Sequence, residues 1–257
     1  MTLTGDFTAI TAQEGPDRLH IRLDRPEVRN AIDATMVEEL HRVCDHLESE
    51  PKILILSGTE VKGKGVFASG ADIRQLRERR RDDALRGINS RLFDRLAHLP
   101  MPVIAAVDGY ALGGGAELAW AADFRIGTPH VVIGQPETGL GIVAAAGAMW
   151  RLRELAGEPL AKEMLLAGRT LGAEEALAAR LITEIHEPEA LLDAAHALAD
   201  RIARQDPLAI RIAKGVFHAP REAHPYVDEL AQAVLFESEA KFDRMQSFLD
   251  RRKERRS

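Results

Sequence analysis

The order of apolar runs along the chain constrains the fold more than any other feature of the sequence. Short runs typical of buried strands, such as residues 53–57 and 102–107, alternate in the first half with segments of helical periodicity. Beyond Ala144 nearly every segment has helical character. Strands that alternate with helices form an α/β core. We therefore expect an α/β fold over residues 1–195 and a helical C-terminal region over residues 196–257.

The boundaries of most elements can be predicted from local signals. Further strands are expected at residues 7–12, 19–23, 124–126 and 131–133, and Asp33 is the expected N-cap of a helix that runs to about Leu47. Helices are expected to begin at Thr170, at Glu187 and at Pro207. A last, long helix has an apolar face, and we expect it to pack on another subunit; its apolar residues are Leu230, Val234, Leu235, Phe242, Met245 and Leu249.

The composition excludes several classes of protein. Hydrophobic residues make up 46% of the chain and charged residues 29%, which suits a packed core. The formal net charge of −6 disfavours a general nucleic-acid binder. The sequence has no run of eighteen apolar residues, its start lacks the features of a signal peptide, and its single cysteine, Cys44, fits a helix core. We expect a cytoplasmic protein without a membrane segment.

Some local patterns resemble binding sites but lack a required part. Residues 58–65 nearly spell a phosphate-binding P-loop, yet Gly65 stands where a magnesium-binding Ser or Thr belongs. Residues 139–144 match a dinucleotide fingerprint, but residues 135–138 separate them from the preceding strand. The nine histidines show no metal-binding spacing, so no metal site is expected. Ser69 lacks the glycine-flanked elbow of a nucleophilic serine, which favours a structural role.

Two glutamates are the strongest candidates for chemistry. Glu117 follows a Gly-Gly-Gly run that opens a helix, and Glu137 ends a Gly-Gln-Pro-Glu segment. The free N–H groups of a first helical turn can hold an anionic oxygen beside such an acid or base. This combination suits chemistry at a thioester carbonyl.

A loop-to-helix junction at residues 67–73 supplies a second set of amides. Asp72 is the expected N-cap, and Gln75 would complete a capping box. The bend at Gly70 would present the Ala71 N–H outward, as one half of an oxyanion hole. Gly114 would supply the other half, because a glycine lets a ligand approach the main chain closely.

Residues 67–73, 102–118 and 134–137 together resemble the enoyl-CoA hydratase/isomerase (crotonase) family. The resemblance runs from the turn at Arg25 and Pro26 to the C-terminal helices. It implies a crotonase-like spiral of repeated ββα units. It also implies that the helical C-terminal region assembles trimers, either alone or paired into hexamers.

The resemblance assigns roles to particular residues. In hydratases of this family the amides that match Ala71 and Gly114 bind the thioester oxygen. Glu117 would orient and activate a water, and Glu137 would protonate the α-carbon of a 2-enoyl-CoA. Coenzyme A arrives with the substrate, so no separate cofactor is expected. Further substrate contacts are implied for Val28, Ser69, Asp72, Ile73, Gly113 and Arg74.

One segment departs from the family pattern. Where hydratases commonly have Pro-Gly-Ala-Gly-Gly-Thr-Gln, this chain has Ala-Ala-Ala-Gly-Ala-Met-Trp at residues 144–150. Ala145 stands where a glycine amide usually helps to hold the water, and alanine restricts φ there. Met149 and Trp150 are also bulkier than the usual residues.

Hydration of a 2-enoyl-CoA is the expected reaction. The alternatives are double-bond isomerisation or another acyl-CoA reaction of the crotonase family, and RNA binding. Double-bond isomerisation needs only one base, so the presence of both glutamates favours hydration. RNA binding occurs in one branch of the family through a basic helix after the Gly-Ala-Asp loop. Here the arginines of residues 72–83 are interleaved with acids, which favours a solvated face. Lys64 and Arg74 are candidates to meet the phosphates of coenzyme A.

Overall fold

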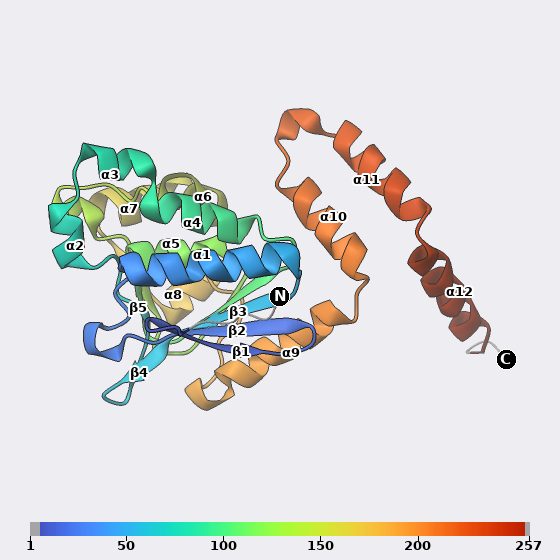
Figure 1. Ribbon diagram of the computed structural model, residues 1–257, viewed down its shortest axis with the longest axis horizontal. Helices are drawn as coiled ribbons and strands as arrows, with labels where there is room; N and C mark the ends of the chain where they lie inside the picture. The colour runs from blue at the N-terminus through green and yellow to red at the C-terminus, as the bar shows by residue number, and fades with distance from the viewer. Residues whose placement is uncertain (1–5, 255–257) are drawn as a thin grey trace. The chain divides into compact units, whose positions relative to one another are not determined.

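The computed structural model describes residues 6–254 and contains two five-stranded sheets (Figure 1). The first sheet has, in spatial order, β1 (Ile10–Glu14), β2 (Arg18–Leu23), β3 (Ile53–Ser57), β6 (Val103–Val107) and β8 (Phe124–Gly127). The second has β10 (Thr170–Gly172), β9 (Val132–Gly134), β7 (Tyr110–Leu112), β5 (Lys64–Ala68) and β4 (Thr59–Val61).

From β5 to β9, successive strands of the chain alternate between the two sheets. Strands β3, β6 and β8 run parallel in the first sheet, and their counterparts β5, β7 and β9 run parallel in the second. Each pair is followed by one or more helices. The chain therefore advances through both sheets at once as a spiral of ββα units.

Helices cover the sheets of this spiral. Helix α1 packs beside α4, and α4 packs beside α5 (Figure 1). Cys44, on α1, is fully buried in the core, as predicted, and burial raises the pKa of its thiol to about 12. The helices before Asp200 are α1 (Ala34–Ser49), α2 (Ile73–Glu78), α3 (Arg81–Arg86), α4 (Ile88–Ala97), α5 (Gly114–Ala121), α6 (Ala148–Ala156), α7 (Glu158–Ala167) and α8 (Ala173–Ala178).

Two helix N-caps follow the sequence signals. The Asp33 carboxylate accepts a hydrogen bond from the Met36 N–H at 2.9 Å and starts α1. Asp72 accepts from the N–H groups of the second and third residues of α2. The expected capping box is only half formed, because the Gln75 side chain turns away and accepts from the Ala34 N–H at 2.9 Å.

The first strand begins later than predicted. Residues 7–9 were expected in a strand that starts at Phe7, but β1 starts at Ile10. The buried carboxylate of Glu39 accepts from the backbone N–H groups of Thr8, Ala9 and Ile10 at 2.7, 2.9 and 3.1 Å. A side chain thus satisfies amides that a strand partner would otherwise bind.

Two predicted helices are wrong in extent. Residues 170–172 form β10, which pairs with β9, so helix α8 begins only at Ala173. The long last helix is two helices, α11 (Tyr226–Phe236) and α12 (Glu239–Glu254). Ser238 separates them: its N–H donates to the Leu235 carbonyl, and its hydroxyl accepts from the Lys241 N–H. A serine at this point satisfies backbone groups that a continuous helix would pair internally.

The near-matches to nucleotide-binding loops have other structures. Residues 59–68 form the β4–β5 hairpin, with Lys62 and Gly63 at positive φ in its turn. Residues 139–144 begin at the end of the short 3-10 helix η2 (Glu137–Leu140) and continue as a loop. The next helix starts only at Ala148. Neither segment therefore places the start of a helix directly after its glycines.

The chain divides into one unit that ends at Asp200 and a second that begins at Arg201. Helix α9 (Leu191–Ala203) spans this boundary, and α10 (Pro207–Phe217) lies with α11 and α12 in the second unit. Among the described residues, the buried hydrophobic side chains end at Ile202. No helix within residues 6–254 is long and apolar enough to cross a membrane.

Candidate active site

A cavity of about 580 Å³ lies in the first unit, where the loop before α2 faces the start of α5. Leu140, Ile142 and Val143 give part of its wall an apolar surface. The cavity brings together residues that the sequence singled out from three separate segments. These are Ser69, Ala71, Ile73, Gly113, Gly114, Glu117 and Glu137.

The two expected oxyanion amides are neighbours in this cavity. A Cβ added to Gly114 would lie 3.6 Å from the Ala71 nitrogen, in ordinary contact. Gly114 is the first residue of α5, so its N–H has no partner in the preceding turn. Within residues 6–254, neither of these two N–H groups donates to a protein acceptor. Both are therefore available to one oxygen of a bound molecule.

Glu117 is almost completely buried, and its carboxylate is held by backbone amides. Its Oε1 accepts from the Ala146 N–H at 2.7 Å and from the Ala148 N–H at 3.0 Å. Burial raises the pKa of Glu117 to about 7, and these two hydrogen bonds act in the opposite direction by favouring the anion. Two amides of the loop at residues 144–148 thus hold the Glu117 carboxylate. Ala145, which belongs to the same loop, lines the cavity.

Glu137 meets a different environment. It is the first residue of η2, and its buried Oε2 has no hydrogen-bond partner in the described structure. A Cβ on Gly113 would lie only 2.6 Å from Glu137 Oε1, and Gly113 has a φ of 52°. Only glycine fits there. Burial raises the pKa of Glu137 and favours its neutral form.

A buried arginine, Arg151, adds positive charge near Glu117. The Arg151 side chain is 6% exposed, and its guanidinium lies 4.2 Å from the centre of the Trp150 ring. Its Nη2 is 3.5 Å from Asp94 Oδ1, and its Nη1 lies against the main chain at Gly147. Gly147 sits between the two residues whose amides bind Glu117. The positive charge lowers the pKa of Glu117, whereas the nearby Glu137 raises it.

Some predicted contact residues lie outside the cavity lining. Val28, Asp72 and Arg74 do not line it, and neither does Lys64. The Ser69 hydroxyl donates to the Val28 carbonyl at 3.4 Å, which gives that serine a structural contact as well as a place in the wall.

Sequence reasoning missed several residues of the cavity. Arg79, Arg80, Asn89 and Ser90 line it although they follow the recognised loop at residues 67–73, Arg79 and Arg80 between α2 and α3 and the other two in α4. In the sequence these residues are marked only by their polarity, and the residues of a solvated helix are polar as well.

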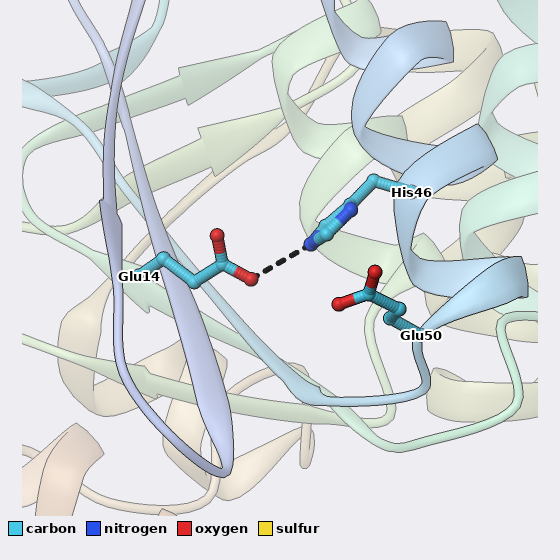
Figure 2. Close-up of side chains that lie close together, drawn as sticks. All are labelled: Glu14, His46 and Glu50. Atoms are coloured by element: carbon cyan, nitrogen blue, oxygen red, sulfur yellow. Dashed lines mark hydrogen bonds and ion pairs between the residues drawn. The ribbon is translucent and has the colours of Figure 1, made fainter. Parts of the chain in front are cut away.

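One group of side chains outside the cavity has the chemistry of metal ligands (Figure 2). Among the described residues, the ligand atoms of Glu14, His46 and Glu50 lie within 4.8 Å of one another. The His46 ring contacts Glu14 Oε1 at 2.8 Å, and the Lys52 ammonium contacts the same oxygen at 2.6 Å. An ammonium on that oxygen opposes a cation, so this cluster is best described as an ion-pair network.

Comparison with known proteins agrees with this geometry. The family model described as enoyl-CoA hydratase/isomerase matches residues 18–257. The chain belongs to the enoyl-CoA hydratase/isomerase family. It is 33% identical to a short-chain-enoyl-CoA hydratase of Clostridium acetobutylicum, with 91% of each chain covered. It is 31% identical to a crotonyl-CoA hydratase of Syntrophomonas wolfei, covering 90% of this chain and 91% of the relative.

A solved structure extends the comparison to the fold. The crystal structure of an enoyl-CoA hydratase from Bacillus anthracis superposes with a TM-score of 0.88 at 28% identity, covering 95% of this chain and 97% of that one. The crotonase fold predicted from the sequence is thus confirmed. Assembly into trimers stays a prediction.

Proposed function

We propose that the protein hydrates 2-enoyl-CoA thioesters. The observation that carries this proposal is the placement of two glutamates in one cavity with two free backbone amides. An isolated carboxylate would support many activities. Two carboxylates with different hydrogen-bond partners beside two free amides suit the addition of water to a conjugated thioester, which needs a base, an acid and a site for the enolate oxygen.

The Ala71 and Gly114 N–H groups bind the thioester carbonyl oxygen in this mechanism. Glu117, in its ionised form and bound by two amides, takes a proton from the attacking water. The water oxygen bonds to the β-carbon, and the electrons of the double bond move to the carbonyl oxygen as an enolate. The amides and the positive end of α5 stabilise that charge.

Glu137 completes the addition. Its neutral carboxyl gives a proton to the α-carbon, and the enolate returns to a thioester carbonyl. The product is a 3-hydroxyacyl-CoA. Glu117 then carries the proton from water and Glu137 is ionised, so one proton must pass between the two groups, directly or through solvent, before the next turnover.

One observation favours isomerisation as a second candidate. The amides of Ala146 and Ala148 both bind Glu117 and are not free to orient a water. An isomerase needs one carboxyl group to move a proton from one carbon of the acyl chain to another. Such an enzyme would use the same oxyanion amides without adding water.

The deciding experiment compares two substrates. Incubation with crotonyl-CoA should remove the absorbance of its conjugated thioester and yield 3-hydroxybutyryl-CoA, identified by mass. A 3-enoyl-CoA of the same length should not gain that absorbance. Conversion of the 3-enoyl-CoA without hydration of crotonyl-CoA would overturn the proposal in favour of isomerisation. The names of the Clostridium and Syntrophomonas relatives support short acyl chains as the first substrates to test.

The exposed apolar side chains after Arg201 support assembly with other copies of this chain. Phe217 is 84% exposed, and large apolar residues on α11 and α12 are also exposed. These include Tyr226, Leu230, Val234, Phe242, Met245, Phe248 and Leu249. We propose that they are covered in a homotrimer or in a hexamer built from two trimers. Light scattering that gives a 28.2 kDa monomer at micromolar concentration would contradict this.

A further inference from the structure

The arginines of α2 and α3 differ in their partners and in their exposure. Arg77 and Arg81 are strongly exposed and lie beside Glu78 and Asp82, respectively. Arg86 is paired with Asp83. Arg79, between the two helices, is partly buried and lines the cavity of the proposed active site. Of the arginines from Arg74 to Arg86, only Arg79 and Arg80 line this cavity, and Arg79 is the less exposed of the two.

Arg79 forms no ion pair with a carboxylate in the described structure, although Asp83 lies near enough for the charge of Arg79 to help lower its pKa. Its Nη1 and Nη2 approach the neutral amide oxygen of Asn89 at 3.4 and 3.5 Å, near the outer limit of hydrogen bonding. A guanidinium presents a fork of donors that matches a carboxylate or phosphate in two parallel bonds. Two long contacts to one amide oxygen leave that fork available to an anion.

Asn89 links this guanidinium to the oxyanion hole. Its Nδ2 lies 3.6 Å from the position that a Cβ on Gly114 would occupy. A single asparagine side chain therefore spans the space between Arg79 and the amide that would hold the thioester oxygen. A short acyl chain that starts at this amide and runs along Asn89 would bring its far end close to Arg79.

The other charges at this end of the cavity do not cancel Arg79. Arg80 also lines the cavity and adds a second positive charge. Asp83 is the one carboxylate among the described residues that line this end, and its interaction with Arg79 is weaker than its contacts with the Arg80 N–H, at 2.8 Å, and with the Arg86 guanidinium. Glu117 and Glu137 lie at the hole itself, where the mechanism requires one of them to carry a proton. The net charge around Arg79 therefore favours an anion.

We propose that the cavity takes short acyl-CoA thioesters whose acyl group ends in a carboxylate, and that Arg79 binds this carboxylate. This rests on the proposed function, because it deepens the substrate class of the same site. The phosphates of coenzyme A carry the same anionic chemistry, so a test must separate the two ends of the substrate. The acyl end is favoured because Asn89 places the guanidinium beside the thioester position.

The test compares the binding of two saturated thioesters by calorimetry. Glutaryl-CoA carries a terminal carboxylate and butyryl-CoA does not, while both carry the same phosphates. We expect wild-type protein to bind glutaryl-CoA more tightly by about tenfold to a hundredfold, as for a charge-assisted bidentate pair. Arg79→Met should remove this preference, because it should weaken the binding of glutaryl-CoA far more than that of butyryl-CoA. Arg79→Lys, which keeps the charge but not the fork, should retain part of it.

Arg77→Met is the matched control, since it removes an exposed arginine of the same run that does not line the cavity. It should keep the preference for glutaryl-CoA. If Arg79→Met weakened both thioesters equally, the arginine would serve the phosphates and the proposal would be wrong. Equal binding of the two thioesters by the wild-type protein would also overturn it, even if the variants failed to fold.

This readout is independent of catalysis, because neither thioester has a double bond to hydrate. Hydration of crotonyl-CoA without any preference for glutaryl-CoA would leave the proposed function standing and refute the role of Arg79. A clear preference without hydration of either unsaturated counterpart would refute the hydratase function and leave the carboxylate site in place.

Discussion

The two glutamates of the cavity have the same side chain but are held by two different regions of the chain. Glu117 lies in the first turn of α5, and the loop at residues 144–148 directs two amides at one of its oxygens. Glu137 begins a 3-10 turn after a proline, and one of its buried oxygens has no partner in the described structure.

This difference teaches how a backbone can divide two chemical roles between identical residues. Amide donors favour the ionised form of a carboxyl group, whereas burial without donors favours the neutral form. The two amides on Glu117 stabilise the anion that would act as the base, and the unpartnered Oε2 of Glu137 can carry the proton that the acid would donate. The charge of each also raises the free energy of ionising the other, so that the pair retains a proton near neutral pH.

The largest effect is expected where the two regions share one element, the oxyanion hole. Gly114→Pro deletes one of its two N–H groups and should abolish thioester chemistry, both hydration and isomerisation. Proline is tolerated at the first position of a helix, and the space around Gly114 admits a Cβ at 3.6 Å. Steady-state hydration of crotonyl-CoA measures the loss of activity. Removal of one donor alone should raise the reaction barrier by about 3 kcal/mol, and the loss should be larger if the proline ring also displaces the substrate.

Gly114→Ala is the control for this variant, because it adds the Cβ but keeps the N–H. It should retain more activity than the proline variant, and circular dichroism should show that both are folded. A folded Gly114→Pro protein with full activity would refute the oxyanion-hole assignment and most of the proposed function.

The next largest effect tests the acid directly. Glu137→Gln keeps the size of the side chain but removes the proton donor, so kcat should fall on the order of 10²-fold or more with little change in binding. Glu117→Gln should cause a similar loss, because the neutral amide cannot take a proton from water. Near-normal turnover in either variant would remove that glutamate from the mechanism.

The two candidate glutamates could be predicted from the sequence, since each follows glycines at a recognisable spacing. The helix that starts near Gly114 and the bend at Gly70 were local signals, and the structure places them together. The buried strands were equally clear, because continuous apolar runs such as residues 53–57 have few other uses.

The partners of the glutamates could not be predicted, because they depend on long-range packing. The amides of Ala146 and Ala148 reach Glu117 across about thirty residues of chain, and no side-chain pattern marks an amide that points inward. Arg79 was hidden for a similar reason. Its sequence neighbours are all charged, and only the break between α2 and α3 at Arg79 and Arg80 turns it toward the cavity.

The pH dependence of activity should report the shared proton of the pair. The pKa values of both glutamates are raised by burial, that of Glu117 to about 7. As pH rises, Glu137 loses its proton and the acid is lost. As pH falls, both carboxyls become protonated and the base is lost. The profile of kcat/KM should therefore be bell-shaped, changing up to about tenfold per pH unit on each limb. A flat profile between pH 5 and 9 would contradict this pairing.

A smaller effect is expected from the arginine behind the pair. Arg151 lowers the pKa of Glu117, so Arg151→Met should raise that pKa and move the acid limb of the profile to higher pH. The loss should be severalfold at pH 6 and smaller at pH 8. Arg151→Lys should restore the position of the limb, whereas a merely structural role would leave it unmoved in both variants. Thermal unfolding separates the change in pKa from a loss of stability.

The smallest effect is expected at Ala145, where the chain departs from the glycine of related hydratases. Ala145 does not have a positive φ, and the donors to Glu117 are the N–H groups of Ala146 and Ala148. Alanine therefore holds an unstrained conformation here and blocks neither donor. Ala145→Gly should change the hydration rate by less than about twofold and lower the stability by roughly 0.5–1 kcal/mol through added freedom of the unfolded chain. A tenfold increase in rate would mean that the alanine methyl group, which lines the cavity, displaces the attacking water. The native loop would then bind Glu117 but leave no room for the attacking water. Isomerisation would become the better assignment for the same two carboxylates.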